Sequence, residues 1–253
     1  MRGSRPAGVP AAQNYWMRYA KVRASSSTVV VGWGERARWR FAAGAATIYR
    51  NYFAPVGNGF GQTSARQFDG LSDVGAALGE AVGQPVESLW DMRNGYALCT
   101  RTGLDVISKH LESLGQDEAD VLRSKLRIGV HRDVEVTDAD GVHRPLVSQA
   151  FCSALPVAYS RVPSAHWWLF ACLVLDAAYE ATMLAAMINA NRGASNLVLL
   201  TRLGGGAFGN EADWIHAAMR RAIQRAGGFG LDVRRVSYGT PSRQLLQLVE
   251  EFQ

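Results

Sequence analysis

Residues 196–210, with the sequence NLVLLTRLGGGAFGN, decide how the fold is interpreted. Leu197 to Leu200 form an unbroken apolar run, which is typical of a parallel strand that is covered on both faces. The glycines that follow remove side-chain bulk and allow positive φ angles, so successive backbone N–H groups can converge on an anion. From residue 213 to about 226 the pattern predicts a helix, with Asn210 or Asp213 as its N-cap. A glycine loop next to a helix N-terminus indicates a phosphate site.

The same run also fits an ordinary tight connection between a strand and a helix. It lacks the Lys-Ser/Thr pair of a P-loop. It also lies near the end of the chain, and not in a first βα unit followed by an acidic residue about 20 positions on, as the dinucleotide fingerprint requires. The loop therefore suggests a bound phosphate without hydride or phosphoryl transfer.

Residues 164–191 form the longest predicted element, a helix that ends where Gly193 can adopt the left-handed conformation. Its apolar length raises the question of a membrane span. Asp176 and Glu180 lie one turn apart in the middle of the segment, and each would cost about 2.5–3.5 kcal/mol at the centre of a bilayer. We therefore expect a core helix with one polar edge, and no membrane partner.

Two strands are predicted before this helix, at 127–137 and 147–159, with a turn at 138–141. Asp133 and Glu135 are two residues apart and so share one face of the first strand. Such a face is usually just solvated. If it borders the phosphate loop, the two carboxylates become candidates for activating a water molecule.

A strand at 231–238 and a helix that begins at Thr240-Pro241 complete the C-terminal part. From residue 127 onward the predicted order is strand, strand, long helix, strand, glycine loop, helix, strand, helix. That order predicts an α/β fold, a mixed sheet with helices on both faces in a three-layer α/β/α domain. Ligands bind such domains at the carboxyl ends of the strands.

The segment between residues 44 and 70 offers amides close to aromatic side chains. Ile48 to Phe53 would form an aromatic face on one helical turn, followed by a glycine loop at 57–61. A packed helix with a surface turn is one interpretation. The other is that Asn51, Gln62 and Gln67 donate and accept hydrogen bonds to a ligand whose ring stacks on an aromatic neighbour.

Asn94-Gly95 is a turn signal, but its flanking residues do not alternate as those of a hairpin do. We therefore expect a strand that runs into a loop. Cys99, Cys152 and Cys172 are odd in number and widely spaced, which supports neither a disulfide framework nor a zinc site. They are expected to be core thiols in a reducing, intracellular protein that needs no metal.

The chain has 253 residues, of which 48% are hydrophobic and 19% charged, as is ordinary for a globular protein. Its net charge of +5 is unevenly placed. Residues 1–40 carry eight Lys or Arg against one Glu, so the remainder is slightly acidic. A nucleic-acid surface needs basic residues on the folded domain, and we expect no such partner.

We therefore divide the chain into a basic leader, 1–40, and one domain, 41–253. Two interpretations of the leader stay open. Its Arg, Ala and Ser content fits a disordered segment or an organelle transit peptide, and residues 1–34 would then be dispensable. Alternatively it is an ordered extension, with VVVGW at 29–33 as a first strand.

The C-terminal half resembles a macrodomain, the ADP-ribose-binding module. CSALPVAY at 152–159 corresponds to that family's His-x-Val-Gly-Pro-x-Tyr type of sequence, and LTRLGGGAFGN at 200–210 to its second phosphate-binding loop. With RNYF, GQT, NGYAL and DVEVT, the chain is similar over about 49–252 to a divergent group that includes bacterial-effector hydrolases removing ADP-ribose from arginine. MRNGYAL at 92–98 is the nearest equivalent of the family's usual Asn-Ala-Ala-Asn motif.

The resemblance implies an ADP-ribosylhydrolase that acts on modified protein, with arginine as the expected linkage. The glycine loop would hold the diphosphate, Phe208 would pack on the distal ribose, and Asn94 with Gly95 would close the site. Asp133 or Glu135 would orient or deprotonate the attacking water. The implied ligand-binding positions are Gly204, Gly205, Gly206, Ala207, Phe208, Gly209, Asn210, Asn94, Gly95, Asn51 and Gln62.

No metal or other cofactor is needed for this chemistry. If neither Asp133 nor Glu135 is the base, the next carboxylates to consider are Asp69, Asp91 and Asp105. The alternative function is a binding module that recognises ADP-ribose without hydrolysing it. Such a module would use the same pocket but would lack a carboxylate beside the distal ribose.

Overall fold

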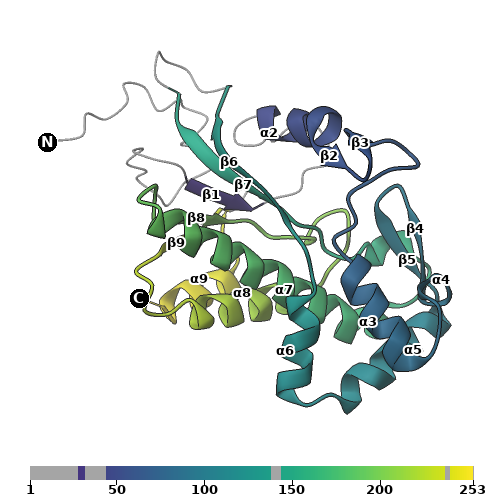
Figure 1. Cartoon of the computed structure of the whole chain (residues 1–253). Coiled ribbons are helices and arrows are strands. Elements are labelled where there is room, and N and C mark those ends of the chain that lie inside the picture. The colour runs from purple at the N-terminus through teal and green to yellow at the C-terminus, as the bar shows by residue number, and fades with distance from the viewer. Residues whose placement is uncertain (1–27, 32–43, 138–143, 237–239, 253) are drawn as a thin grey trace, which may run out of the picture.

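A computed structural model describes residues 28–31, 44–137, 144–236 and 240–252 (Figure 1). Its main sheet has five strands in the order β6-β7-β1-β8-β9, in which β6 is antiparallel to β7 and the other neighbours are parallel. These strands are β1 (Thr28–Val31), β6 (Gly129–Glu135), β7 (Leu146–Phe151), β8 (Leu197–Leu200) and β9 (Asp232–Arg235). Two small antiparallel ribbons lie outside it, formed by β2 (Pro55–Val56) with β3 (Gly59–Phe60) and by β4 (Trp90–Arg93) with β5 (Tyr96–Cys99).

The helices divide between the faces and one end of this sheet. They are α2 (Gly44–Ile48), the π-helical turn η1 (Tyr49–Phe53), α3 (Ser72–Val82), α4 (Val86–Leu89), α5 (Arg101–Ser113), α6 (Gln116–Ser124), the 3-10 turn η2 (Val157–Tyr159), α7 (Ser164–Asn191), α8 (Ala212–Arg225) and α9 (Arg243–Glu250). The mixed α/β class is confirmed.

Adjacent residues of β7 show that both faces of the sheet are covered. Ala150 belongs to the core formed with α7 and α8. The ring of Phe151 points to the opposite face, where the guanidinium of Arg50 from η1 lies 4.9 Å from its centroid. All four residues of β8 are buried, as its apolar run predicts.

The N-terminal strand β1 lies in the middle of the sheet. It pairs in parallel with β7 from Thr28 to Val31, and with β8 through Val29 and Val30. Of the two interpretations of the leader, the ordered strand is the one found at these residues. This position argues against the expectation that residues 1–34 are dispensable, because removing β1 would take away the hydrogen-bonding partner of both neighbouring strands. The rest of the leader, residues 1–27 and 32–40, lies outside the described residues, as do the last two positions of VVVGW.

The 28-residue helix α7 connects two hydrophobic cores. Its first half, including Trp167 and Phe170, packs against α3, α5 and the β4–β5 ribbon. Its second half, including Tyr179 and Met183, packs between the sheet and α8. Of the described helices it is the one long and apolar enough to cross a membrane. Its burial on both sides identifies it here as a core helix.

The polar edge of α7 is used to bind its neighbours. Asp176 accepts a hydrogen bond from Arg123 of α6 at 3.1 Å, and Glu180 accepts one from Arg221 of α8 at 2.5 Å. Arg221 also binds Asp120 of α6. These ion pairs are half-buried and form one network across three helices, which is the case in which ion pairs contribute most to stability.

Two sequence-based expectations need correction. Asn94-Gly95 forms a true hairpin turn between β4 and β5, with φ of 51° and 79°. Both angles are positive, as a tight two-residue turn requires, so the turn residues decide the local structure despite the poor alternation of the flanks. The strand expected at 147–159 ends at Phe151, because the chain then turns through Pro156 into the 3-10 turn.

We predict that deleting residues 1–34 lowers the melting temperature by more than about 10 °C or prevents folding, because the loss of a central strand exceeds the few kcal/mol that such a shift represents. Differential scanning calorimetry measures the change. A deletion of residues 1–24, which stops before β1, is the matched control and separates the strand from the residues before it. A melting temperature within a few degrees of the wild type for the longer deletion would contradict the central role of β1.

Candidate ligand-binding site at the carboxyl ends of the strands

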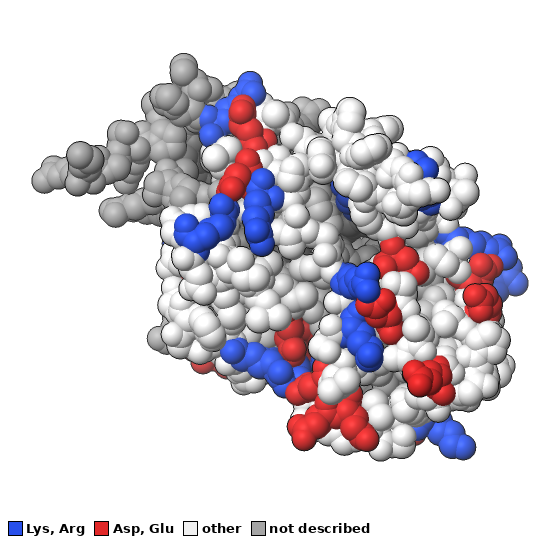
Figure 2. All heavy atoms as spheres, in the orientation of Figure 1, with Lys and Arg blue, Asp and Glu red and all other residues white. Residues whose placement is uncertain are grey.

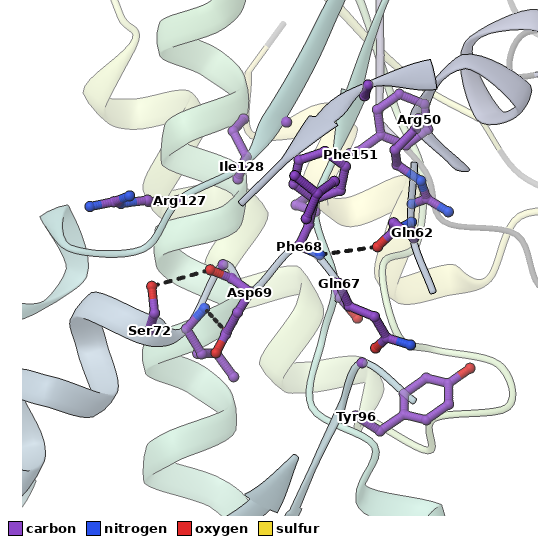
Figure 3. A pocket seen from close by; sticks show the side chains of 18 of the residues that line it. Arg50, Gln62, Gln67, Phe68, Asp69, Ser72, Tyr96, Arg127, Ile128 and Phe151 are labelled. Atoms are coloured by element: carbon purple, nitrogen blue, oxygen red, sulfur yellow. Dashed lines mark hydrogen bonds between the residues drawn. The ribbon is translucent and has the colours of Figure 1, made fainter. Parts of the chain in front are cut away.

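A cavity of about 1150 Å³ opens where β7 ends (Figure 3). Because β7, β1 and β8 are parallel, their carboxyl ends lie at the same edge of the sheet, where α/β domains bind ligands. Segments that are distant in the sequence form the wall, together with Val174: residues within 46–57, 62–72, 92–97, 126–131 and 151–156. Such a volume admits a ligand of dinucleotide size.

Three polar groups on one side of the cavity hold each other in place. The Oδ1 atom of Asn51 accepts hydrogen bonds from Gln62 Nε2 at 3.0 Å and from the guanidinium of Arg50 at 3.1 Å. Gln62 Oε1 in turn accepts from the backbone N–H of Phe68 at 3.1 Å (Figure 3). Asn51 and Gln62 were predicted to bind a ligand, and the structure brings both to the wall. Burial lowers the pKa of Arg50.

Aromatic rings surround these amides. The Tyr49 ring lies 4.5 Å from the His131 ring, and Phe151 lies beneath Arg50. Phe68 lines the cavity, and its side chain is 45% exposed. An exposed ring beside fixed amides can stack on a flat ligand such as a nucleobase.

Asp69 is the only carboxylate among the described residues of the wall. One of its carboxylate oxygens accepts a hydrogen bond from the N–H of Leu71 at 2.8 Å, and its carbonyl oxygen accepts one from Ser72 Oγ at 3.3 Å. The first bond holds the side chain and the second holds the backbone just before α3 (Figure 3). The second carboxylate oxygen has no hydrogen bond within the described part of the chain, and it is therefore available to water or ligand.

Cys152 also lines the cavity but is unsuited to nucleophilic chemistry. Burial raises the pKa of its thiol to about 12, so the reactive thiolate is scarce at neutral pH. Burial likewise raises the pKa of Cys99 to about 12. Both side chains are buried core thiols, as their positions in the sequence predict.

The glycine loop packs directly against the segment that follows β7. Gly204 and Gly209 have φ of 71° and 69°, and a Cβ atom at either would lie 2.4 Å or 2.8 Å from the Cβ of Ala154 or Ala158. Both positions therefore require glycine for conformation and for space. Gly206, by contrast, is exposed, with open space around it.

Asn210 ties the end of the glycine loop to its start and to the segment after β7. Its Nδ2 atom donates to the carbonyl of Leu155 at 2.8 Å, and its backbone N–H donates to Gly204 at 3.0 Å. The N–H groups of Gly205 and Gly209 are also used within the loop. Gly206 and Ala207 are exposed, and their N–H groups donate to no backbone group in the described structure, so they form the outward part of the loop that an anion could meet. Asn210 was predicted as a ligand contact, and its buried side chain instead holds the backbone.

Phe208 joins the loop to the cavity. Its ring forms edge-to-face contacts with Tyr96 and Tyr159 at centroid distances of 5.6 Å and 5.5 Å. Tyr96 lines the cavity, next to the predicted positions Asn94 and Gly95, which line it as well. The glycine loop itself does not line the cavity but borders it through this aromatic cluster.

The structure does not bring Asp133 and Glu135 to the cavity wall. A β-bulge interrupts β6 between His131 and Val134, and Asp133 has a φ of 56° within it. Its carboxylate is held by Arg192 at the end of α7, at 2.5 Å and 2.7 Å. Glu135 pairs with Arg144 at 2.9 Å on the exposed surface.

Asp91 and Asp105, two of the three alternative candidates for the general base, also lie away from the cavity. Asp91 pairs with Arg93, and Asp105 bonds His166 at 3.0 Å. Of the three alternative carboxylates, only Asp69, which lies just before α3, lines the cavity. Its importance depends on tertiary structure, so sequence spacing alone could not rank it above the others.

The surface charges are mixed in sign. Figure 2 shows Lys and Arg side chains beside Asp and Glu side chains across one face of the molecule. This distribution gives no reason to propose a nucleic-acid partner for that face. Within the described residues, no group of three or more His, Cys, Asp or Glu side chains converges as a metal site.

No protein-family model, curated protein or solved structure matches this chain.

We predict that Asn210→Asp destabilises the protein by about 1–3 kcal/mol, because the buried Leu155 carbonyl loses its donor and meets a carboxylate. Urea denaturation measures the free energy of unfolding. Asn196→Asp is the matched control at the other end of β8, since this exposed amide also donates to a carbonyl, that of Gly230, at 2.8 Å. Equal effects of the two substitutions would show that the Asn210 side chain does not hold the loop.

Proposed function

We propose that this chain binds ADP-ribose at the glycine loop and the adjoining cavity and hydrolyses its linkage to a protein side chain, with arginine as the modified residue. The macrodomain resemblance supplies the substrate class. One structural observation carries the proposal: the glycine loop is joined through Phe208 and Tyr96 to a dinucleotide-sized cavity with fixed amides, exposed aromatic rings and one carboxylate. The three-layer macrodomain fold is part of this proposal.

Each part of ADP-ribose has chemically suitable residues. The outward N–H groups at Gly206 and Ala207 suit the diphosphate, because backbone N–H groups bind anions without needing a basic side chain. Phe68 offers a stacking surface for adenine, and Asn51 with Gln62 offers hydrogen bonds. Asn94 and Gly95 at the hairpin tip would enclose the distal ribose, as the resemblance implies.

Asp69 replaces Asp133 and Glu135 as the proposed general base. It would accept a proton from a water molecule as the water oxygen attacks the anomeric carbon of the distal ribose. The bond from that carbon to the guanidine nitrogen breaks, and the nitrogen takes a proton, so one water yields free ADP-ribose and unmodified arginine. The open oxygen of Asp69 and its fixed position beside Leu71 suit this role.

A reader module is the second candidate, and one observation favours it. Asp133 and Glu135, the carboxylates of the DVEVT sequence, are held in ion pairs away from the cavity. That leaves a single carboxylate on the described wall to serve both the attacking water and the leaving group. A protein that binds ADP-ribose without turnover would need none.

We predict that Gly206→Glu weakens ADP-ribose binding by at least about 100-fold, because a like charge next to the diphosphate costs several kcal/mol. Isothermal titration calorimetry measures the affinity. The substitution should not unfold the protein, since the position is exposed and has no atom within 4 Å of an added Cβ. Gly206→Ala adds bulk without charge and should bind nearly as the wild type does. Unchanged affinity in Gly206→Glu would remove the loop from the site.

We predict that Asp69→Asn lowers hydrolysis of arginine-linked ADP-ribose by at least about 100-fold, within the range for loss of a general base. The affinity for ADP-ribose should change by less than about tenfold, or 1.4 kcal/mol. Asparagine keeps an oxygen that can accept from Leu71, so the local backbone is preserved. Release of free ADP-ribose from arginine-modified protein is the assay.

Glu135→Gln and Asp133→Asn are the controls for this experiment, and both should retain turnover. Loss of turnover in either, with Asp69→Asn fully active, would return the catalytic role to β6. Wild-type protein that binds ADP-ribose but releases none from arginine-linked or carboxylate-linked substrate would establish the reader function.

A further inference from the structure

Two arginines lie at the carboxyl ends of β8 and β9, on the side of the glycine loop away from the cavity. Arg202 follows β8, and Arg235 is the last residue of β9. The strand order places β9 and β7 on opposite sides of β8. The Arg202 side chain folds back over Gly205, where an added Cβ would lie 2.4 Å from its Nε atom. Arg235 pairs with Leu200 in the sheet, and the N–H of Val236 donates to the Leu200 carbonyl at 2.8 Å, so Arg235 lies beside the end of β8, where Arg202 follows two residues later. Burial lowers the pKa of Arg235, and the charge of Arg202 lowers it further.

Neither arginine pairs with a carboxylate in the described structure. Arg235 donates from one terminal nitrogen to His216 Nε2 at 3.3 Å, and its buried Nε atom has no partner among the described residues. The neighbouring Arg234, which points to the other face of β9, is by contrast held by Asp232 at 2.5 Å. A half-buried guanidinium without a counter-charge is costly, because it gives up hydration without compensation.

His216 completes the group from the second turn of α8. Its side chain is buried, and its pKa is lowered by burial first and by Arg235 and Arg202 next. Asp213, one turn earlier on α8, accepts a hydrogen bond from the side-chain amide of Gln244 at 2.9 Å. Arg220 of the same helix is neutralised by Glu251 at 2.6 Å. Among the described residues, no carboxylate therefore forms an ion pair with Arg202 or Arg235.

We propose that Arg202, Arg235 and His216 form a second anion site, one that binds a phosphate group at the carboxyl ends of β8 and β9. Two guanidinium groups can present several N–H donors to one phosphate in paired, charge-assisted hydrogen bonds. A phosphate would provide the missing counter-charge and an acceptor for the free Nε atom of Arg235. The site does not rest on the proposed hydrolase activity, because its residues neither line the cavity nor belong to the outward part of the loop.

The experiment is a titration of the full-length protein with inorganic phosphate at constant ionic strength against chloride. The imidazole resonances of His216 in the NMR spectrum report binding at the site, and the melting temperature reports linkage to stability. A parallel titration with ribose 5-phosphate distinguishes free phosphate from a phosphomonoester as the preferred form. We expect a saturable shift of the His216 resonances and a rise in melting temperature with at least one of the two.

Three variants test the assignment. Arg202→Gln changes an exposed residue and should not affect folding, and Arg235→Gln removes the buried cation. Each should weaken phosphate binding by at least about tenfold, because charge-assisted hydrogen bonds carry most of the affinity. Arg93→Gln removes an equal charge at a remote exposed position and should bind as the wild type does. The proposal is overturned if neither phosphate compound gives a saturable shift in the wild type. It is equally overturned if Arg202→Gln binds phosphate unchanged, or if Arg93→Gln weakens binding as much as Arg202→Gln.

Discussion

The need to bury α7 on nearly all sides governs the rest of the structure. A helix of 28 residues that is apolar around most of its circumference cannot lie on the surface of a sheet as an ordinary amphipathic helix does. Its first half is covered by α3, α5 and the β4–β5 ribbon, and its second half by the sheet and α8. The two acidic residues on its remaining edge, Asp176 and Glu180, then require basic partners, which α6 and α8 supply. The cavity is a result of the same arrangement. It lies where the two groups of elements that share α7 meet, and Val174 near the middle of the helix contributes to its wall.

Long, strongly patterned elements could be predicted from the sequence, and short or long-range ones could not. The helix at 164–191 and the strand at 197–200 were predicted with the bounds that the structure shows, because Gly193, with a φ of 77°, marks the end of the helix and an unbroken apolar run marks the strand. The helix expected at 213–226 starts and ends within one residue of α8. The position of β1 could only be left open, since a strand of four residues becomes central through partners that lie far along the chain. The hairpin at Asn94-Gly95 was missed because the flanks were given more weight than the turn.

The candidate site shows the same division. Asn51, Gln62, Asn94 and Gly95 were predicted and line the cavity. Phe208 and Asn210 were predicted as ligand contacts, but their side chains are buried and hold the glycine loop against the segment after β7. Asp133 and Glu135 share a strand in the sequence, and the β-bulge between His131 and Val134 together with two arginine partners gives them other roles. A carboxylate such as Asp69 becomes a candidate only when the fold shows which side chains meet, because nothing in its local sequence distinguishes it.

The central place of β1 has a consequence for how the chain is made. β1 is made before its partners, since β7 and β8 follow it by about 120 and 170 residues, so the sheet depends on contacts of high sequence separation. At typical rates of synthesis of about 5–20 residues per second, the apolar VVV segment waits for several seconds without a strand to pair with. Unpaired apolar strands of this kind are the segments that associate wrongly during synthesis. The expression yield and the chaperone dependence of this chain should therefore depend on how β1 is protected before it pairs, independently of what the folded protein binds.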